Sequence, residues 1–116
     1  METVNDVCRK TGVTRKQLFY YDRIGLLKPT KRIGPQKAKL YGAKALERLD
    51  QILLYQKAGL RLSEIGMILD GTEEEKAFYL NNAIRRLQAE AKRIDGQIAF
   101  AKSLLDPDHG NEDSRE

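Results

Sequence analysis

Residues 7–21 of the chain read VCRKTGVTRKQLFYY, a pattern typical of two short helices joined by a tight turn. Gly12 can adopt the positive φ that such a turn requires, and Thr14 is a favourable N-cap for the second helix. Leu18 and Tyr21 are three residues apart, so both would face inward from that helix. The stretch predicts a helix-turn-helix, a motif whose second helix lies in the major groove of DNA.

The outward face of the second helix combines basic and aromatic side chains, which suit contacts to phosphates and base edges. These residues are Arg15, Lys16, Phe19, Tyr20 and Arg23. A solvated helix with a basic face would show the same residue types. The stretch alone therefore leaves both interpretations open, and the rest of the chain has to decide between them.

The length and charge of the chain favour one small nucleic-acid-binding domain with at most one appended element. The 116 residues carry a net charge of +4, which is unevenly distributed. Residues 1–69 hold 14 Lys and Arg against 6 Asp and Glu, whereas residues 70–116 hold 7 against 11. The basic half has the charge expected of a protein that binds nucleic acid.

We do not expect a membrane protein or a secreted protein. No apolar run approaches the roughly 20 residues of a transmembrane helix, and no signal peptide opens the chain. The single cysteine, Cys8, cannot form an internal disulfide, so the reducing cytoplasm is the expected location. One cysteine and one histidine, His109, are too few for a thiolate metal centre. We expect no metal and no cofactor.

Residues 28–44 contain six basic residues, no acidic residue, and several prolines and glycines. Proline and glycine disfavour a helix here, and residues 38–41 have the composition of a short strand. The segment predicts a basic β-hairpin, or wing, beside the helix-turn-helix, with an ordinary solvated loop as the alternative. Helices are expected at residues 4–10, 14–23, 43–58 and 62–69.

A long helix is predicted after Thr72, which forms a capping box with Glu75. Its apolar residues alternate at spacings of three and four over about 43 Å, which predicts a coiled-coil seam. Residues 1–71 offer too short a face to cover this seam, so self-association is favoured over docking on the same chain. Phe78 and Tyr79 lie off the seam and are expected to pack against the winged domain. The seam residues are Ala77, Leu80, Ile84, Leu87, Ala91, Ile94, Ile98, Ala101 and Leu105.

Four segments together resemble the mercury-resistance-regulator (MerR) family of bacterial transcription factors: TGVT at 11–14, LFYYDRIGLL at 18–27, KLY at 39–41 and GLRLSEI at 59–65. The resemblance implies a mostly α fold, with a winged helix-turn-helix DNA-binding domain at 1–71. A coiled-coil dimerisation helix at 72–105 and a disordered polar tail at 106–116 would follow. It further implies a homodimer that binds a pseudo-palindromic promoter site and bends and underwinds the DNA for RNA polymerase.

The resemblance implies base-edge or phosphate contacts from Thr14, Arg15, Lys16 and Tyr20 and wing contacts to phosphate from Lys39 and Tyr41. Three departures from the family pattern affect these contacts. Phe19 stands where the family usually has an arginine, which removes one expected contact. Ala38 and Lys39 replace a usual Tyr-Arg pair in the wing, and Arg61 replaces a serine N-cap. The expected DNA-binding residues are Thr14, Arg15, Lys16, Tyr20, Arg23, Lys31, Arg32, Lys37, Lys39 and Tyr41.

An enzyme is not expected, because the chain shows no nucleophile–base set, phosphate loop or paired-carboxylate motif. Two alternatives to a promoter-specific regulator remain. An architectural or recombination-accessory protein could bend DNA with the same winged fold. An adaptor built on the coiled coil is the third interpretation, but it leaves the basic wing unexplained.

Overall fold

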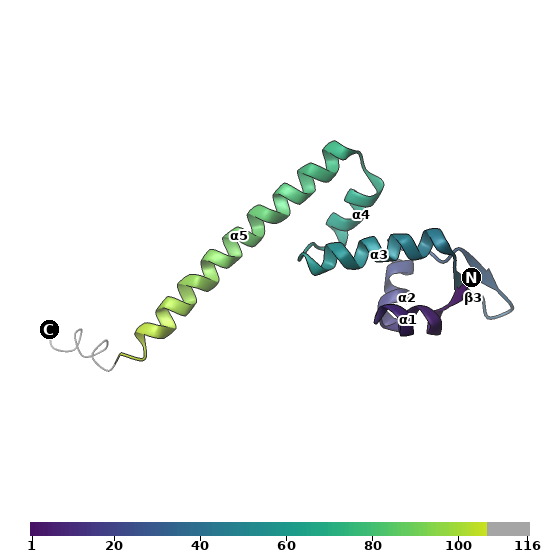
Figure 1. The fold of residues 1–116 in the computed structure, drawn as a ribbon, viewed down its shortest axis with the longest axis horizontal. Coiled ribbons are helices and arrows are strands. Elements are labelled where there is room, and N and C mark those ends of the chain that lie inside the picture. The colour runs from purple at the N-terminus through teal and green to yellow at the C-terminus, as the bar shows by residue number, and fades with distance from the viewer. Residues whose placement is uncertain (107–116) are drawn as a thin grey trace.

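The computed structural model describes residues 1–106, which form five helices and a small antiparallel sheet at one edge of the molecule (Figure 1). Helices α1 to α4 and the sheet form a compact unit, and α5 projects from it as a long arm. This arrangement confirms the predicted mostly α fold with a winged helix-turn-helix and a long C-terminal helix. The elements are β1 (Glu2–Thr3), α1 (Val4–Thr11), α2 (Arg15–Arg23), β2 (Lys31–Ile33), β3 (Ala38–Tyr41), α3 (Ala43–Lys57), α4 (Leu62–Asp70) and α5 (Glu73–Ser103).

The turn between α1 and α2 is fixed by local hydrogen bonds, as the sequence predicts. Gly12 has a φ of 81°, and its backbone N–H donates to the carbonyl of Cys8 at 2.9 Å, which ends α1. The hydroxyl of Thr14 accepts from the N–H of Gln17 at 3.0 Å, and the Gln17 side chain accepts from the Thr14 N–H. This capping box starts α2 without any contribution from the rest of the fold.

The wing is an antiparallel hairpin of β2 and β3, with β1 added on the other side of β3. Lys31 pairs with Leu40, and Ile33 pairs with Ala38. The hairpin confirms the predicted strand at 38–41. The sequence does not predict strand β1, because two residues are too few to show an alternating pattern.

The core lies where α1, α2, α3, α4 and β3 meet, and α2 is held at its centre. Leu18 and Tyr21 are buried, as their spacing predicts, and the Tyr21 hydroxyl donates to Gln56 of α3 at 2.7 Å. Burial raises the pKa of Tyr21. The largest fully buried side chains are Val7, Leu18, Tyr21, Leu27, Tyr41, Leu49, Ile52 and Ile65.

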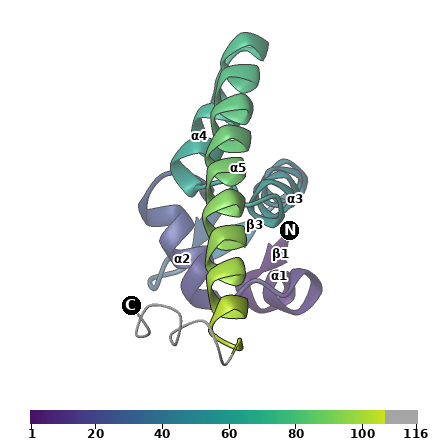
Figure 2. The ribbon, with the colours of Figure 1, turned by 90° about the vertical axis from the view of Figure 1, so that its left-hand side faces the viewer.

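The domain covers only part of the apolar surface of its own α5 helix. Near its start, Ala83 is fully buried, and Tyr79 and Leu80 pack against the core. Ile84, Ile94 and Ile98 remain 49 %, 41 % and 48 % exposed. Figure 1 shows the C-terminal part of the helix extending away from the domain, and in Figure 2 this arm lies in front of the domain. The domain of the same chain therefore covers part of the predicted seam and leaves the rest exposed to solvent.

Two expectations for α5 differ from the structure. The helix ends at Ser103, so Leu105 lies beyond it. The backbone N–H groups of Leu105 and Asp106 donate to carbonyls three residues back, as in a 3₁₀ turn. Pro107 also disfavours a helical conformation in the residue that precedes it. Phe78 is 59 % exposed. Its ring centre lies 5.2 Å from that of Tyr79, and the two rings are nearly perpendicular. Tyr79 makes the expected domain contact, whereas Phe78 is turned about 100° away on the helix. Phe100 is also exposed. Of the predicted tail at 106–116, residues 107–116 lie outside the described residues.

A polar network fixes the direction of α5. The Arg86 guanidinium donates to Glu64 of α4 at 2.7 Å and to the carbonyl of Gly59 at 3.0 Å. Glu64 also accepts from the backbone N–H of Arg61 at 2.8 Å, so it satisfies the start of α4 where Arg61 brings no capping hydroxyl. The hydrogen bond from Arg86 is the main cause of the lowered pKa of Glu64.

We expect Gly59→Ala to destabilise the fold by roughly 1–2 kcal/mol. Gly59 has a φ of 88°, and a Cβ there would lie 3.3 Å from a methyl group of Leu87. Thermal unfolding followed by circular dichroism measures the effect. Gly96→Ala is the control, because Gly96 lies inside α5 with nothing within 4 Å of an added Cβ. That change should stabilise the helix by up to about 1 kcal/mol, and equal melting temperatures for the two variants would contradict the strain expected at position 59.

Candidate nucleic-acid interface

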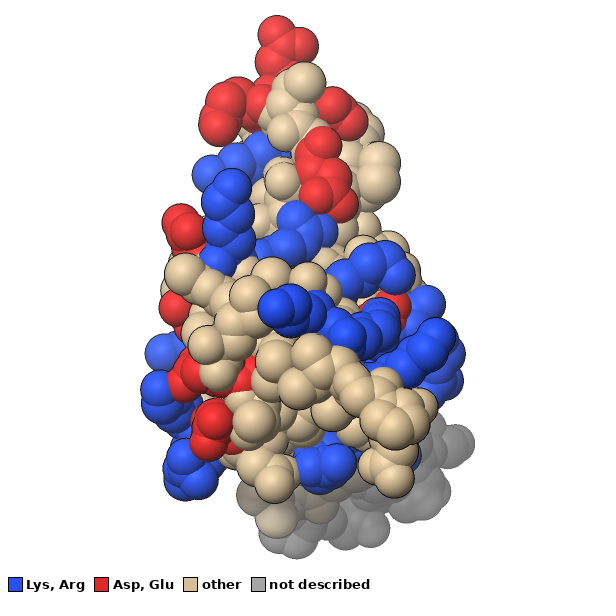
Figure 3. Space-filling model, turned by 90° about the vertical axis from the view of Figure 1, so that its right-hand side faces the viewer, with Lys and Arg blue, Asp and Glu red and all other residues tan. Residues whose placement is uncertain are grey.

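Helix α2 presents most of its predicted contact residues to solvent. Arg15, Lys16, Tyr20 and Arg23 are all exposed, and the Arg23 guanidinium lies 5.7 Å from the centre of the Tyr20 ring. Thr14 is exposed as well, but its hydroxyl is occupied as the N-cap. Figure 3 shows Lys and Arg side chains spread over the middle of the face that it views, with a cluster of Asp and Glu at its upper end.

The wing is joined to α2 by one buried carboxylate, Asp22. Its Oδ1 accepts from Arg32 of β2 at 2.8 Å, and its Oδ2 lies 2.9 Å from the Lys39 Nζ of β3. The ammonium of the exposed Lys28 is further away, at 3.9 Å from Oδ1. The hydrogen bond from Arg32, ahead of that from Lys39, lowers the pKa of Asp22 to about 2 against the opposing effect of burial. Strands β2 and β3 are therefore both tied to the recognition helix.

Sequence reasoning misses Asp22, although one signal is available. It is the only acidic residue between Asp6 and Glu47. A lone carboxylate in so basic a stretch is expected to have cationic partners. The structure shows which cations these are.

The Asp22 contacts divide the basic wing residues into two groups. Arg32 and Lys39 are engaged by the carboxylate, and the Lys39 side chain is only 19 % exposed. Lys31 and Lys37 are exposed and make no ion pair within residues 1–106. Lys31 and Lys37 thus remain clear of the carboxylate, whereas Lys39 contacts it and helps to hold the wing in place.

Tyr41 does not fit its expected role. Its side chain is fully buried, and its hydroxyl has no hydrogen-bond partner within the described part of the chain. Burial raises the pKa of Tyr41. We correct the expectation of a phosphate contact from this side chain: position 41 follows the inward alternation of β3, and its ring fills the core between the wing and the helices.

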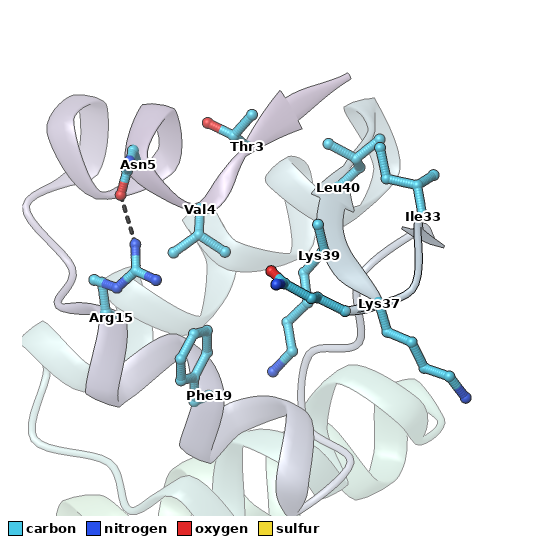
Figure 4. Close-up of a pocket in the computed structure, with 11 residues that line it drawn as sticks. Thr3, Val4, Asn5, Arg15, Phe19, Ile33, Lys37, Lys39 and Leu40 are labelled. Carbon is cyan, nitrogen blue, oxygen red and sulfur yellow. Dashed lines mark hydrogen bonds between the residues drawn. The ribbon is translucent and has the colours of Figure 1, made fainter.

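A hollow of about 440 Å³ separates α2 from the wing, and Figure 4 shows the side chains around it. Phe19 stands between Arg15 and Lys39, whose cationic groups lie 5.5 Å and 4.1 Å from the ring centre. Arg15 Nη1 also donates to Oδ1 of Asn5 in α1 at 2.6 Å. No carboxylate from residues 1–106 lines this hollow, so its electrostatic character suits an anionic partner.

Two other classes of site do not occur within residues 1–106. No three His, Cys, Asp or Glu side chains there are grouped so that they could hold a metal ion. No helix in this part of the chain has both the length and the apolar character required to cross a bilayer.

Comparison with known proteins identifies relatives of this architecture. A family model described as "MerR HTH family regulatory protein" matches residues 3–72. The HTH-type transcriptional activator mta of Bacillus subtilis is 33 % identical over 108 residues, which are 92 % of this chain and 42 % of that protein. The HTH-type transcriptional regulator SkgA of Caulobacter vibrioides is 36 % identical over 110 residues, 95 % of this chain and 43 % of SkgA. The chain thus spans less than half the length of these curated relatives.

Solved structures agree with this result. The crystal structure of MtaN, the N-terminal part of the Bacillus subtilis multidrug transporter activator, superposes with a TM-score of 0.76 at 31 % identity. The match covers 90 % of this chain and 98 % of that one. A MerR-family transcriptional regulator from Bacillus cereus gives a TM-score of 0.74 at 28 % identity, with coverages of 87 % and 77 %.

The Asp22 contacts predict a specific loss of stability in acid. Because the folded-state pKa of about 2 lies below the ordinary 3.8, the contribution is fully present above about pH 4 and is lost as pH falls towards 2. Its size is roughly 2 kcal/mol. Asp22→Asn should be less stable than the wild type at pH 7 and should converge with it by about pH 2 in urea unfolding. Asp50→Asn, on the exposed side of α3, should follow the wild-type pH profile, and a constant difference between wild type and Asp22→Asn from pH 7 to 2 would contradict the assignment.

Proposed function

Because this chain belongs to the MerR family of helix-turn-helix regulatory proteins, we propose that it binds promoter DNA sequence-specifically and regulates transcription. The observation that carries the proposal is the pairing of an exposed basic and aromatic α2 face with a wing held beside it by Asp22. In such an arrangement α2 enters the major groove and the wing lies along the backbone. Residues 1–71 would form the DNA-binding unit, and a DNA partner agrees with the expected cytoplasmic location.

The proposed DNA contacts fall into two groups. On α2, the exposed side chains of Arg15, Lys16, Tyr20 and Arg23 would approach base edges and flanking phosphates. On the wing, Lys31 and Lys37 would contact phosphates. Arg32 and Lys39 would act mainly by positioning the wing through Asp22.

We further propose that α5, within residues 72–105, pairs with the same helix of a second copy to form a homodimer. The apolar stripe of Ile84, Ile94 and Ile98 is left uncovered by its own domain. Ala91 and Ala101 lie on the same stripe and would let two helices approach closely. An uncovered apolar seam of this length on a helix is the usual signature of a coiled-coil partner.

A two-fold symmetric dimer would present two copies of α2, which accounts for a pseudo-palindromic site. As the family resemblance implies, such a dimer would bend and underwind the promoter so that RNA polymerase can engage it. The architectural or recombination-accessory role remains the alternative, since it would use the same winged surface. Genome-wide footprinting distinguishes the two: regulator sites should lie within promoters, whereas sites without relation to promoters would favour the architectural role.

Replacing Ile94 and Ile98 together with Asp should convert the dimer to monomers. Both side chains lie on the exposed stripe, and aspartates there would bury uncompensated charges on pairing. Light scattering at micromolar concentration measures the mass. Ala89→Asp adds the same charge on the outer side of α5 and should leave the dimer intact. A monomeric wild type would overturn the dimer proposal.

DNA binding should weaken steeply with salt. A dimer that makes about 8 phosphate contacts should give a slope near −7 for log affinity against log salt. Lys37→Ala should flatten that slope by about 1 per subunit, as measured by fluorescence anisotropy between 50 and 200 mM salt. Lys57→Ala, at the far end of α3, serves as the control and should retain the wild-type slope. Affinity that is independent of salt would contradict the proposed interface.

A further inference from the structure

We propose that Arg15 reads a guanine in each half-site, and that Asn5 and Phe19 are positioning residues that hold its guanidinium for that contact. This inference rests on the proposed DNA binding and assigns one specificity determinant within it. The family resemblance gives Arg15 a base-edge or phosphate contact without choosing between them or naming a base, and it treats Phe19 as the loss of a contact.

Arg15 is held on two sides before any DNA arrives. Its Nη1 donates to Oδ1 of Asn5 at 2.6 Å, which ties the side chain to the exposed surface of α1. Its guanidinium carbon lies 5.5 Å from the centre of the Phe19 ring, one helical turn further along α2. A long arginine side chain normally loses rotamer freedom on binding. These two contacts restrict it in advance, and preorganisation of this kind supports recognition.

The remaining hydrogen-bonding capacity of Arg15 suits a base edge. A guanidinium carries five N–H donors, and the bond to Asn5 uses one of them. The planar fork matches the O6 and N7 acceptors of guanine, the commonest specific contact in the major groove. Arg15 is the first residue of α2, and the N-terminal residues of a recognition helix are those that contact base edges.

The neighbouring cations are arranged differently. Lys16 is exposed and makes no ion pair or side-chain hydrogen bond within residues 1–106. Its ammonium is therefore free to contact a phosphate. Lys39 Nζ lies 4.1 Å from the Phe19 ring centre but is committed to Asp22. Phe19 thus supports a base-reading arginine on one side and a wing-holding lysine on the other (Figure 4).

The test is selection of binding sites by the full chain from a pool of random-sequence duplex DNA, followed by affinity measurements on the selected site. The wild type should select one guanine per half-site that Arg15→Ala no longer selects. The change should lower discrimination at that base pair roughly 5- to 100-fold. Arg15→Lys keeps the charge but replaces the planar fork with a single ammonium, so it should lower the same preference while retaining the wild-type salt dependence.

Asn5→Ala and Phe19→Leu should each lower discrimination at that same base pair, by a smaller factor, and leave the preferences elsewhere unchanged. Phe19→Tyr keeps an aromatic ring beside Arg15 and should retain the wild-type preference. Lys16→Ala is the matched control: it removes a charge from α2 and should weaken binding without changing the preference at this base pair. Melting temperatures confirm that each variant is folded, and all of these positions are exposed.

Replacing the selected guanine with 7-deazaguanine, which lacks the N7 acceptor, gives a second readout. It should weaken binding by the wild type but not by Arg15→Ala. If Arg15→Ala still selects the guanine, the inference is wrong while the proposed DNA binding stands. If Asn5→Ala and Phe19→Leu both keep full discrimination, their positioning role is wrong. If the wild type enriches no sequence at all, sequence-specific binding itself fails, and this inference fails with it.

Discussion

The relation between the recognition helix and the wing depends on one buried carboxylate. Asp22 is almost fully covered and accepts from Arg32 of β2 while contacting the ammonium of Lys39 in β3. Replacing Asp22 would leave the Arg32 and Lys39 cations without this partner, and the lowered pKa of Asp22 corresponds to a loss of roughly 2 kcal/mol. Because these cations share one carboxylate, the net charge of the cluster stays positive. The wing is fixed, and the surface keeps its attraction for phosphates.

The same logic applies at the other end of the domain, where a carboxylate fixes the long helix. Glu64 binds both Arg86 of α5 and the backbone N–H that begins α4, and Ala83 fills the apolar contact beside it. The direction of α5 is therefore set by the domain that carries α2. In the proposed dimer, this rigid connection would convert the pairing of two α5 helices into a defined separation between two recognition helices, as half-site recognition requires.

The sequence predicts those features whose partners are close along the chain. The capping boxes at Thr14 and Thr72 join residues three apart, so the helix starts follow directly from the sequence. Asp22 is different, because Arg32 and Lys39 lie 10 and 17 residues away on a hairpin whose register no local pattern specifies. The prediction for Tyr41 is wrong because its burial depends on how the wing packs against the helices. Likewise, a heptad pattern marks apolar positions on α5 but cannot tell that Ala83, off the seam, is the residue that the domain buries completely.

Phe19 shows how a departure from a family pattern can be compensated within one surface. From the sequence, an aromatic at a position usually held by arginine removes a cationic contact. In the structure, positive charge is present at this place nonetheless, because Arg15 and Lys39 both lie close to the Phe19 ring. A second arginine at position 19 would repel both of these cations, whereas the ring attracts them. The aromatic therefore allows α2 and the wing to bring two positive charges to one hollow that no described carboxylate lines, and it helps to hold one of them, Arg15, at the start of α2.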